Sequence, residues 1–321
     1  MNGTLLVSDY IENRYADRLD RLAPELARVV LTRDGPSGPP ETVVASFFSS
    51  DLYPERAAQY MMVIAQATRL RWLHSFSAGV DHPAFLALMD RGVRLSHSAG
   101  CNAVPVAHTA VMYVLALSRG LPAWMENARA KVWKLHEVGE LEGKVLAVLG
   151  LGHIGSQVVR LGKALGMRVI GMRRRPRGDE TVETWPLDRL NELLAAADYL
   201  VLCLPLNDGS RRVLDDAALR RMKPGAYLIN VGRGELIEEA ALVSALQEGR
   251  IAGAALDVFE QEPLPASSPL WEMDNVIVTP HNAGQSDGSA TRATELFLDN
   301  LGRYLRGQGL RNEMTPAATQ V

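Results

Sequence analysis

The sequence predicts an α/β protein with two domains, the second of which contains a doubly wound parallel sheet. Three observations lead to this prediction. At 321 residues, the chain is long enough for two domains of ordinary size. From residue 144 onward, short apolar runs alternate with stretches of helical periodicity. Apolar strands separated by helices are typical of a parallel sheet covered on both faces.

The strands of the second half are predicted from unbroken apolar runs. KVLAVL at residues 144–149 is the first, and RVIGM at 168–172 and YLVLCL at 199–204 follow. Further strands are predicted at 226–231, 253–258 and 276–279, and helices at 154–165, 187–196, 216–222 and 238–247. Because crossovers between parallel strands are right-handed, this order predicts a Rossmann-type domain, which we expect over residues 102–285.

The first half repeats this alternation less regularly. Strands are predicted at 4–7, 29–32, 43–47, 72–76 and 93–96, and helices at 13–22 and 55–65. GPSGPPE at 35–41 predicts a loop, residues 104 to about 134 one long helix, and residues 291–305 a final helix. We therefore expect a smaller, flavodoxin-like α/β domain formed by residues 1–101 and 286–321, which would bind the substrate.

Composition narrows the classes of partner. A net charge of -3 gives no reason to expect nucleic acid, and the apolar runs are too short to span a membrane. The amino terminus lacks a basic stretch leading into a long apolar run, so secretory targeting is not expected. Cys101 and Cys203 are far apart, which suits a reducing compartment. We expect a cytoplasmic protein without a metal site.

A glycine-rich turn follows the strand KVLAVL and opens the next helix. Gly150 permits the tight turn, Gly152 lets the backbone approach a pyrophosphate, and Gly155 allows close packing of helix on strand. The N–H groups of such a helix end attract phosphates. The pattern predicts a dinucleotide site that also includes Ile154 and His153, although His153 is more simply interpreted as loop filler than as a catalyst.

The end of the second strand indicates which dinucleotide binds. NAD sites carry an acidic residue there, whereas this strand runs directly into Arg173 and Arg174. Guanidinium groups form charge-assisted bonds with a 2′-phosphate. We therefore expect NADP(H) to be preferred and NAD(H) to bind with lower affinity. A solvated basic loop is the alternative, and it is the simpler interpretation of Arg175 and Arg177.

Three titratable or charged residues follow predicted strand ends. Arg233 lies in INVGRGEL, Glu262 in ALDVFEQEP and His281 in VTPHNAG. Ligands of open α/β sheets bind beyond the carboxyl ends of the strands, so these three side chains are expected to converge beside the nicotinamide. Histidine holds and releases a proton near neutrality, a carboxylate favours its charged form, and a guanidinium pairs with a substrate carboxylate.

The motifs GLGHIG, MKPGAYLINVGRG, GAALDVFEQEPL and TPHNAG occur in this order, and with them the chain resembles the D-isomer-specific 2-hydroxyacid dehydrogenase family. The resemblance implies that Arg233, Glu262 and His281 form the catalytic trio, with His281 as proton donor. It implies further cofactor contacts from residues at the strand ends: Leu204, Pro205, Val231, Gly232, Asp257, His281 and Gly284. Asp257 is equally well interpreted as a structural cap.

The resemblance also implies a substrate loop in the first domain. Ser77–Asp81 reads SAGVD, and backbone N–H groups of Ala78, Gly79 and Val80 would bind the substrate carboxylate together with Arg233 and His281. An ordinary turn between strand and helix is the alternative. Where many relatives have Val-Ala-Glu, this chain has Val106-Ala107-His108, which leaves the role of His108 open.

The resemblance implies reduction of a small 2-oxo acid, such as glyoxylate or hydroxypyruvate, to the D-2-hydroxy acid by a homodimeric enzyme. Bulkier 2-oxo acids stay open as substrates. Formate dehydrogenases of the family carry glutamine where Glu262 stands, which disfavours formate. A dinucleotide-sensing scaffold like the corepressors of this fold is the alternative from another class. The apolar residues Trp124 and Trp133 favour a dimer.

Overall fold

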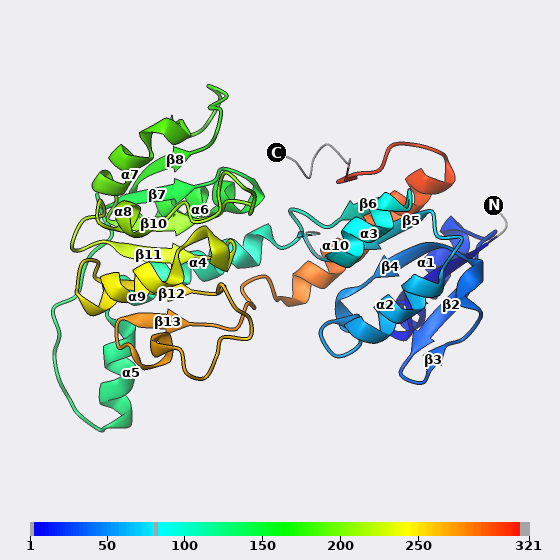
Figure 1. The fold of residues 1–321 in the computed structure, drawn as a ribbon, viewed down its shortest axis with the longest axis horizontal. Helices are drawn as coiled ribbons and strands as arrows, with labels where there is room; N and C mark the ends of the chain where they lie inside the picture. Colours follow the sequence, from blue (N-terminus) through cyan, green and yellow to red (C-terminus); the bar gives the residue numbers. More distant parts are fainter. Residues whose placement is uncertain (1–2, 80–82, 315–321) are drawn as a thin grey trace. The chain divides into compact units, whose positions relative to one another are not determined.

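The structure is a computed structural model that describes residues 3–79 and 83–314. The chain forms two compact units. One combines the stretches Met1–Asn102 and Ser286–Val321, and the other is Ala103–Gln285. Both are drawn in Figure 1.

The first unit contains a sheet whose described strands run in the order β3-β2-β1-β4-β5-β6. Its strands are β1 (Thr4–Ser8), β2 (Ala27–Thr32), β3 (Gly35–Pro36), β4 (Val43–Phe48), β5 (Trp72–Ser75) and β6 (Arg94–His97). All pair in parallel except β3, which is antiparallel to β2. The order of the parallel strands is that of flavodoxin, which confirms the predicted class of this part.

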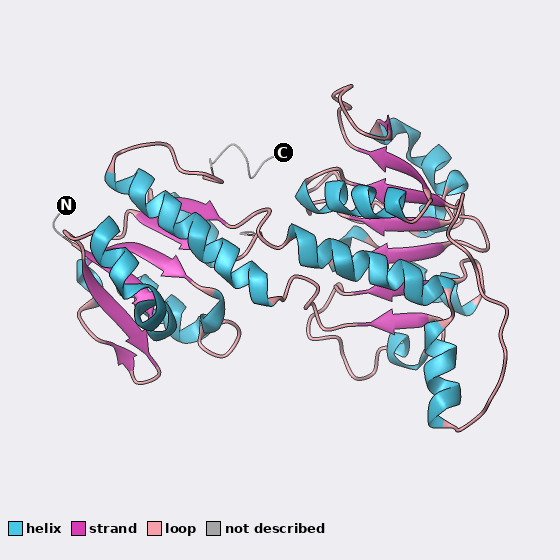
Figure 2. Cartoon of the chain, turned by 180° about the vertical axis from the view of Figure 1, so that it is seen from behind, coloured by secondary structure: helices cyan, strands magenta, loops and turns pink. Residues whose placement is uncertain are grey.

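Helices lie on both faces of this sheet. They are α1 (Asp9–Leu22), α2 (Ala57–Gln66), α3 (Pro83–Asp90) and α10 (Asp287–Leu305), with short 3-10 turns η1 (Pro40–Thr42) and η2 (Ser50–Leu52). Figure 2 shows α10 beside α1 on one face, where Phe297 stacks between Phe47 and Trp72 of the sheet. Helix α3 was not among the predicted elements. The predicted loop 35–41 instead contains β3 and the start of η1.

The second unit contains a wholly parallel sheet in the order β13-β12-β11-β10-β7-β8-β9 within the described residues. Its strands are β7 (Val145–Leu149), β8 (Arg168–Met172), β9 (Glu183–Trp185), β10 (Tyr199–Leu202), β11 (Tyr227–Asn230), β12 (Gly253–Leu256) and β13 (Val276–Val278). The order reverses between β7 and β10, as in the Rossmann fold, so the predicted class is confirmed. The short strand β9 was missed, because three residues are too few for a periodic signal.

Helices cover both faces of this second sheet, as Figures 1 and 2 show. They are α4 (Ala103–Ser118), α5 (Leu121–Arg129), α6 (His153–Ala164), α7 (Leu190–Ala196), α8 (Asp216–Leu219) and α9 (Glu239–Gln247), with 3-10 turns η3 (Leu187–Arg189), η4 (Gly234–Leu236) and η5 (Pro269–Glu272). Successive residues of a strand point to opposite faces, and in the central strands β7 and β10 nearly all of them are buried. Leu149 and Leu202 belong to one apolar cluster, and Val148 and Val201 to the other.

The predicted long helix over residues 104 to 134 is wrong, because the chain breaks between α4 and α5. Gly120 adopts a left-handed φ of 62°, and Pro122 stands at the start of α5, so the two helices meet at a bend of 69°. Among the described residues, no single helix is long and apolar enough to cross a membrane, and only this bent pair passes that test jointly.

Candidate active site

In the second unit, the last residues of neighbouring strands pair with one another, so their carboxyl ends are aligned. The paired residues at these ends are Met172, Leu149, Leu202, Asn230, Leu256 and Val278. The chain therefore leaves six neighbouring strands at one edge of the sheet. The predicted cofactor residues Leu204, Pro205, Val231, Gly232 and Asp257 follow these ends, as do the glycine turn and the arginines.

The glycine turn is tightly packed against its neighbours at two glycines and open at the third. Gly150 has a φ of 107°, and a Cβ there would lie 2.8 Å from the carbonyl of Cys203. A Cβ on Gly155 would lie 1.9 Å from the carbonyl oxygen of Gly150, so only glycine fits between α6 and the turn. Gly152, at the N-cap of α6, faces open space. Open space at the N-terminus of a twelve-residue helix fits the phosphates of a dinucleotide.

The other two residues of the predicted turn lie at the start of α6. His153 is exposed and Ile154 is half-buried. Gly232, in the loop after β11, lies where a Cβ would press on Leu236 and approach the carbonyl of Leu204. The backbone at the ends of β10 and β11 is therefore close together, next to the turn that follows β7.

His281 and Glu262 form a hydrogen-bonded pair, with Nδ1 of the imidazole 2.7 Å from Oε2 of the carboxylate. The other carboxylate oxygen, Oε1, accepts from the backbone N–H of Phe259 at 3.1 Å. Both side chains are partly exposed. Because Nδ1 is held by Glu262, Nε2 is the ring nitrogen available to another molecule.

The pair shifts both pKa values in the direction that favours a charged imidazolium. The hydrogen bond to Glu262 raises the pKa of His281 above its ordinary value, against the effects of burial and of the positive charge of Arg233. Burial works to raise the pKa of Glu262, but the hydrogen bonds from His281 and from the backbone of Phe259 bring it below its ordinary value. His281 therefore holds its proton more firmly than a free histidine.

Arg233 lies after β11, at the N-cap of the short turn η4. Its backbone carbonyl accepts from Nδ2 of Asn230 at 2.8 Å, and its guanidinium Nη1 donates to the carbonyl of Gly232 at 2.9 Å. Asn230 is fully buried and also accepts from the N–H of Gly232, so it fixes the loop that carries the arginine. The charge of Arg233 acts on both His281 and Glu262, so the guanidinium lies within electrostatic range of the pair.

Asp257 organises the loop on which His281 stands. Its carboxylate is buried and accepts three hydrogen bonds, from the hydroxyl of Thr279 at 2.6 Å and from the backbone N–H groups of Asn282 and Ala283 at 3.0 Å each. The N–H of His281 donates to the backbone carbonyl of Asp257 at 2.8 Å. These bonds hold His281 at a φ of 48°, a left-handed conformation that few residues besides glycine adopt.

The loop that follows β8 contains a carboxylate that sequence reasoning missed. Arg173 is partly buried and Arg174 is exposed. Nη1 of Arg173 lies 3.3 Å from Oε1 of Glu180, seven residues farther along. Linear order gave no signal of this contact, because it depends on how an irregular loop folds back.

The predicted substrate loop lies in the first unit and is described only in part, since Val80 falls outside the described residues. The hydroxyl of Ser77 accepts from the N–H of Gly79 at 3.2 Å, and the hydroxyl of Ser75 accepts from the N–H of Ser77. Ala78 is half-buried. Within this segment the N–H of Gly79 is thus already used by a neighbouring hydroxyl.

A series of buried hydrogen bonds links the strands β5 and β6 next to this loop. Nε1 of Trp72 donates to the hydroxyl of Ser96, which lies 2.7 Å from Nδ1 of His74. Nε2 of His74 lies 3.1 Å from the hydroxyl of Ser98, which in turn donates to the carbonyl of Ser75. Since the Ser98 hydroxyl is already a donor, Nε2 carries a proton, and the Ser96 hydroxyl, which accepts from Trp72, can donate to Nδ1 of a neutral ring. Burial lowers the pKa of His74 to about 3, assisted by the charge of His97.

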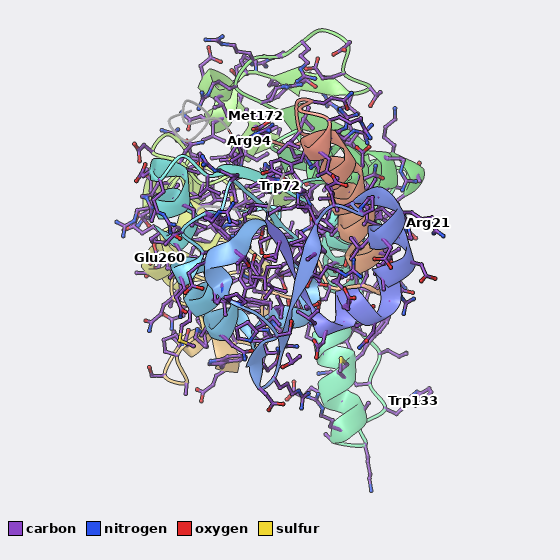
Figure 3. The ribbon with its side chains drawn as sticks, turned by 90° about the vertical axis from the view of Figure 1, so that its right-hand side faces the viewer. Arg21, Trp72, Arg94, Trp133, Met172 and Glu260 are labelled. Carbon is purple, nitrogen blue, oxygen red and sulfur yellow. The ribbon has the colours of Figure 1, made fainter. Side chains whose placement is uncertain are left out.

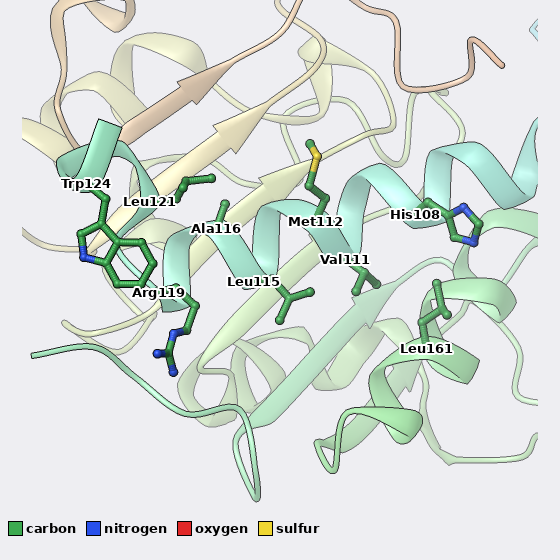
Figure 4. A pocket seen from close by; sticks show the side chains of 9 residues that line it. All are labelled: His108, Val111, Met112, Leu115, Ala116, Arg119, Leu121, Trp124 and Leu161. Carbon is green, nitrogen blue, oxygen red and sulfur yellow. The ribbon is translucent and has the colours of Figure 1, made fainter. Parts of the chain in front are cut away.

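His108 lies in an apolar hollow on the face of α4. The hollow also contains Met112, Leu115, Trp124 and Leu161, as Figure 4 shows. Beyond α5 the chain continues with Trp133 and Leu135, which are 97% and 89% exposed. Figure 3 shows Trp133 pointing away from the ribbon.

Among the described residues, no group of three or more histidine, cysteine or acidic side chains is arranged to hold a metal ion.

Comparison with known sequences gives one family. The profile described as "D-isomer specific 2-hydroxyacid dehydrogenase, NAD binding domain" matches residues 111–283. A glyoxylate/hydroxypyruvate reductase B from Erwinia tasmaniensis is 35% identical over 268 residues, which are 79% of this chain and 81% of the relative. A D-3-phosphoglycerate dehydrogenase from Methanocaldococcus jannaschii is 35% identical over 254 residues, which are 78% of this chain but 48% of that longer relative.

Comparison with solved structures gives the same family over almost the whole chain. The crystal structure of a D-isomer specific 2-hydroxyacid dehydrogenase from Xanthobacter autotrophicus, in complex with NADPH and MES, superposes with a TM-score of 0.81. The two sequences are 30% identical, and the match covers 99% of this chain and 100% of that one. The resemblance noted in the motifs thus extends to both units.

Proposed function

Because the chain belongs to the D-isomer specific 2-hydroxyacid dehydrogenase family, we propose that it is an NADP(H)-dependent oxidoreductase that reduces a small 2-oxo acid to the D-2-hydroxy acid. Glyoxylate and hydroxypyruvate are the proposed substrates. The observation that carries this proposal is the hydrogen bond of 2.7 Å between His281 and Glu262, on loops after neighbouring parallel strands. Such a pair delivers a proton where negative charge develops on a reacting oxygen.

The chain's own residues supply the proton and the orientation. A bound reduced nicotinamide supplies the hydride that the carbonyl carbon accepts. His281 donates a proton from Nε2 to the carbonyl oxygen, since Nδ1 is bonded to Glu262. Glu262 keeps the imidazole charged and oriented until that transfer. Arg233 binds the substrate carboxylate and polarises the carbonyl, because a planar guanidinium binds carboxylates with good directionality.

The dinucleotide is proposed to lie along the carboxyl ends of the strands of the second unit. The turn of Gly150, Gly152 and Gly155 would hold the pyrophosphate, and Arg173 with Arg174 would bind a 2′-phosphate. NADP(H) is therefore preferred and NAD(H) binds with lower affinity. The NADPH in the Xanthobacter structure supports this preference. Asp257 and Gly284 are proposed to lie beside the nicotinamide. Ala78, Gly79 and Val80 are proposed to bind the substrate carboxylate, for which the N–H of Gly79 would exchange the hydroxyl of Ser77 for the substrate.

A homodimer is proposed as the working assembly. Apolar side chains are exposed along α4, α5 and the segment that follows, among them Met112, Leu115, Trp124 and Trp133. Contiguous exposed apolar surface marks sites of protein association. A second copy of this chain would cover it, and the cytoplasm remains the expected compartment.

A substrate panel with both cofactors tests this function. Oxidation of NADPH and of NADH would be followed with glyoxylate, hydroxypyruvate, pyruvate and phenylpyruvate. We expect turnover of the small 2-oxo acids with NADPH and slower turnover with NADH. Preference for phenylpyruvate would move the substrate class to bulkier acids. Tight binding of NADPH without turnover of any of these acids would reject the enzyme and favour a dinucleotide-sensing scaffold.

A further inference from the structure

Glu180 brings a negative charge to the arginine that the proposed function assigns to the 2′-phosphate. It lies in the loop between β8 and β9, and its Oε1 is 3.3 Å from Nη1 of Arg173. The side chains of Glu180 and Arg173 are 10% and 22% exposed. The contact is therefore partly shielded from water, which strengthens it relative to an open surface ion pair.

The carboxylate of Glu180 is fixed by the backbone of its own loop. The N–H of Arg177 donates to Oε1 at 2.7 Å, and the N–H of Gly178 donates to Oε2 at 2.8 Å. Gly178 has a φ of 87°, a conformation suited to glycine, which turns its N–H toward the carboxylate. The backbone bond from Arg177, then that from Gly178, holds the pKa of Glu180 below its ordinary value, so this group is ionised at neutral pH.

Only one N–H group of Arg173 is directed at Glu180. A guanidinium has five N–H donors, so Arg173 can also bind a phosphate. Its net attraction for that phosphate is nevertheless reduced, because a fixed carboxylate neutralises part of its charge. Arg174, which the proposed function assigns to the same ligand, is exposed.

We propose that Glu180 is a cofactor-specificity residue, which acts on Arg173 to weaken the preference of the site for a dinucleotide with a 2′-phosphate. The inference rests on the proposed function, since it takes the adenosine ribose to lie at the end of β8, as in other sheets of this topology. A carboxylate there opposes a 2′-phosphate. NADH has no charge at that position. Glu180 therefore weakens the binding of NADPH and leaves the binding of NADH unchanged.

The variant Glu180→Gln tests the inference by binding alone. Dissociation constants of NADPH and NADH would be measured by calorimetry without substrate. We expect the preference for NADPH over NADH to rise about three- to tenfold, through tighter binding of NADPH, because one negative charge is removed at short range. Glu183→Gln is the matched control. Its carboxylate contacts Arg168, at the opposite end of β8, and Trp185, so it should change the preference less than about twofold.

The background Arg173→Gln shows whether Glu180 acts through the arginine. There, Glu180→Gln should raise the preference by no more than about twofold, since the paired guanidinium is gone. A rise of full size in that background would overturn the proposal, and so would an unchanged or reduced preference in the single variant. A wild-type chain that binds neither NADPH nor NADH would instead refute the proposed function.

Discussion

The hydroxyl of Thr279 donates a hydrogen bond of 2.6 Å to the carboxylate of Asp257 and so ties the end of β13 to the end of β12. The same carboxylate accepts from the N–H groups of Asn282 and Ala283. His281 lies between these donors. One buried side chain thus fixes the loop that presents the proposed proton donor.

The variant Asp257→Asn should destabilise the protein by about 1–3 kcal/mol. An amide has one oxygen in place of two, so its N–H₂ group must face a backbone N–H that loses its acceptor in a buried position. Urea unfolding measures this loss. Asp274→Asn, at an exposed aspartate of the loop before β13, should change the stability by less than about 0.5 kcal/mol. Equal stability of the two variants would contradict the structural role of Asp257.

Replacement of His281 by alanine should lower the turnover of 2-oxo acid reduction by about 100-fold or more. Positioned acid and base groups contribute rate factors of at least this size. The dissociation constant of NADPH should stay within a few-fold, because the proposed phosphate contacts come from other residues. Steady-state kinetics and calorimetry give the two quantities. An almost unchanged turnover would remove this histidine from the mechanism.

The variant Glu262→Gln should move the pH profile of reduction to lower pH. Reduction needs the protonated form of His281, so the rate falls as the pH rises through its pKa. The hydrogen bond to Glu262 raises that pKa, and a neutral glutamine removes most of the effect. The alkaline decline of kcat should therefore begin at a lower pH than in the wild type. A decline at the same pH in both proteins would show that Glu262 does not set this pKa.

His74 should make the protein less stable as the pH falls below about 6.5. Its pKa is about 3 in the folded protein, whereas an unfolded histidine titrates near 6.5. Between these values the unfolded chain binds more protons, so stability rises with pH by about 1.4 kcal/mol per unit. His74→Gln abolishes this contribution. Urea unfolding at pH 7, 6 and 5 should show a steeper loss in the wild type, and parallel losses would contradict a neutral His74.

The apolar face of α4 should determine the oligomeric state. Replacing both Met112 and Leu115 by aspartate places charges on the exposed apolar surface, and we expect the dimer to dissociate. Sedimentation equilibrium at micromolar concentration measures the mass, and circular dichroism checks that the helices persist. A monomeric wild type would reject the dimer before any variant is made.

The fold class was predictable because its signals are local and repeated. The apolar runs of β7, β10 and β11 are buried on both faces, and an unbroken apolar run of this length can be recognised in the sequence as a strand. The break between α4 and α5 carried signals as well, namely Gly120 and Pro122, which the prediction of one long helix did not take into account. A glycine in the left-handed conformation followed by a proline ends one helix and begins another.

The residues of the candidate site could be predicted only where they directly follow the ends of neighbouring strands. Glu262 and His281 follow neighbouring parallel strands, so simple topology brings them together. Asp257 was assigned to the cofactor or to a cap, and its three bonds to the His281 loop depend on tertiary detail. The contact of Glu180 with Arg173 follows from the path of an irregular loop, for which the sequence has no periodic signal.

The loop from Arg173 to Val182 lies outside the paired region of the sheet, whereas Gly155 is wedged against the carbonyl of Gly150. Exchange of that loop therefore leaves the contact of Gly155 with Gly150 in place, provided that the backbone bond from Arg173 to Trp185 and the bond from Lys163 of α6 to the carbonyl of Thr181 are kept. A graft of about ten residues in this loop should therefore change the preference between NADPH and NADH, while the turn of Gly150, Gly152 and Gly155 keeps its geometry.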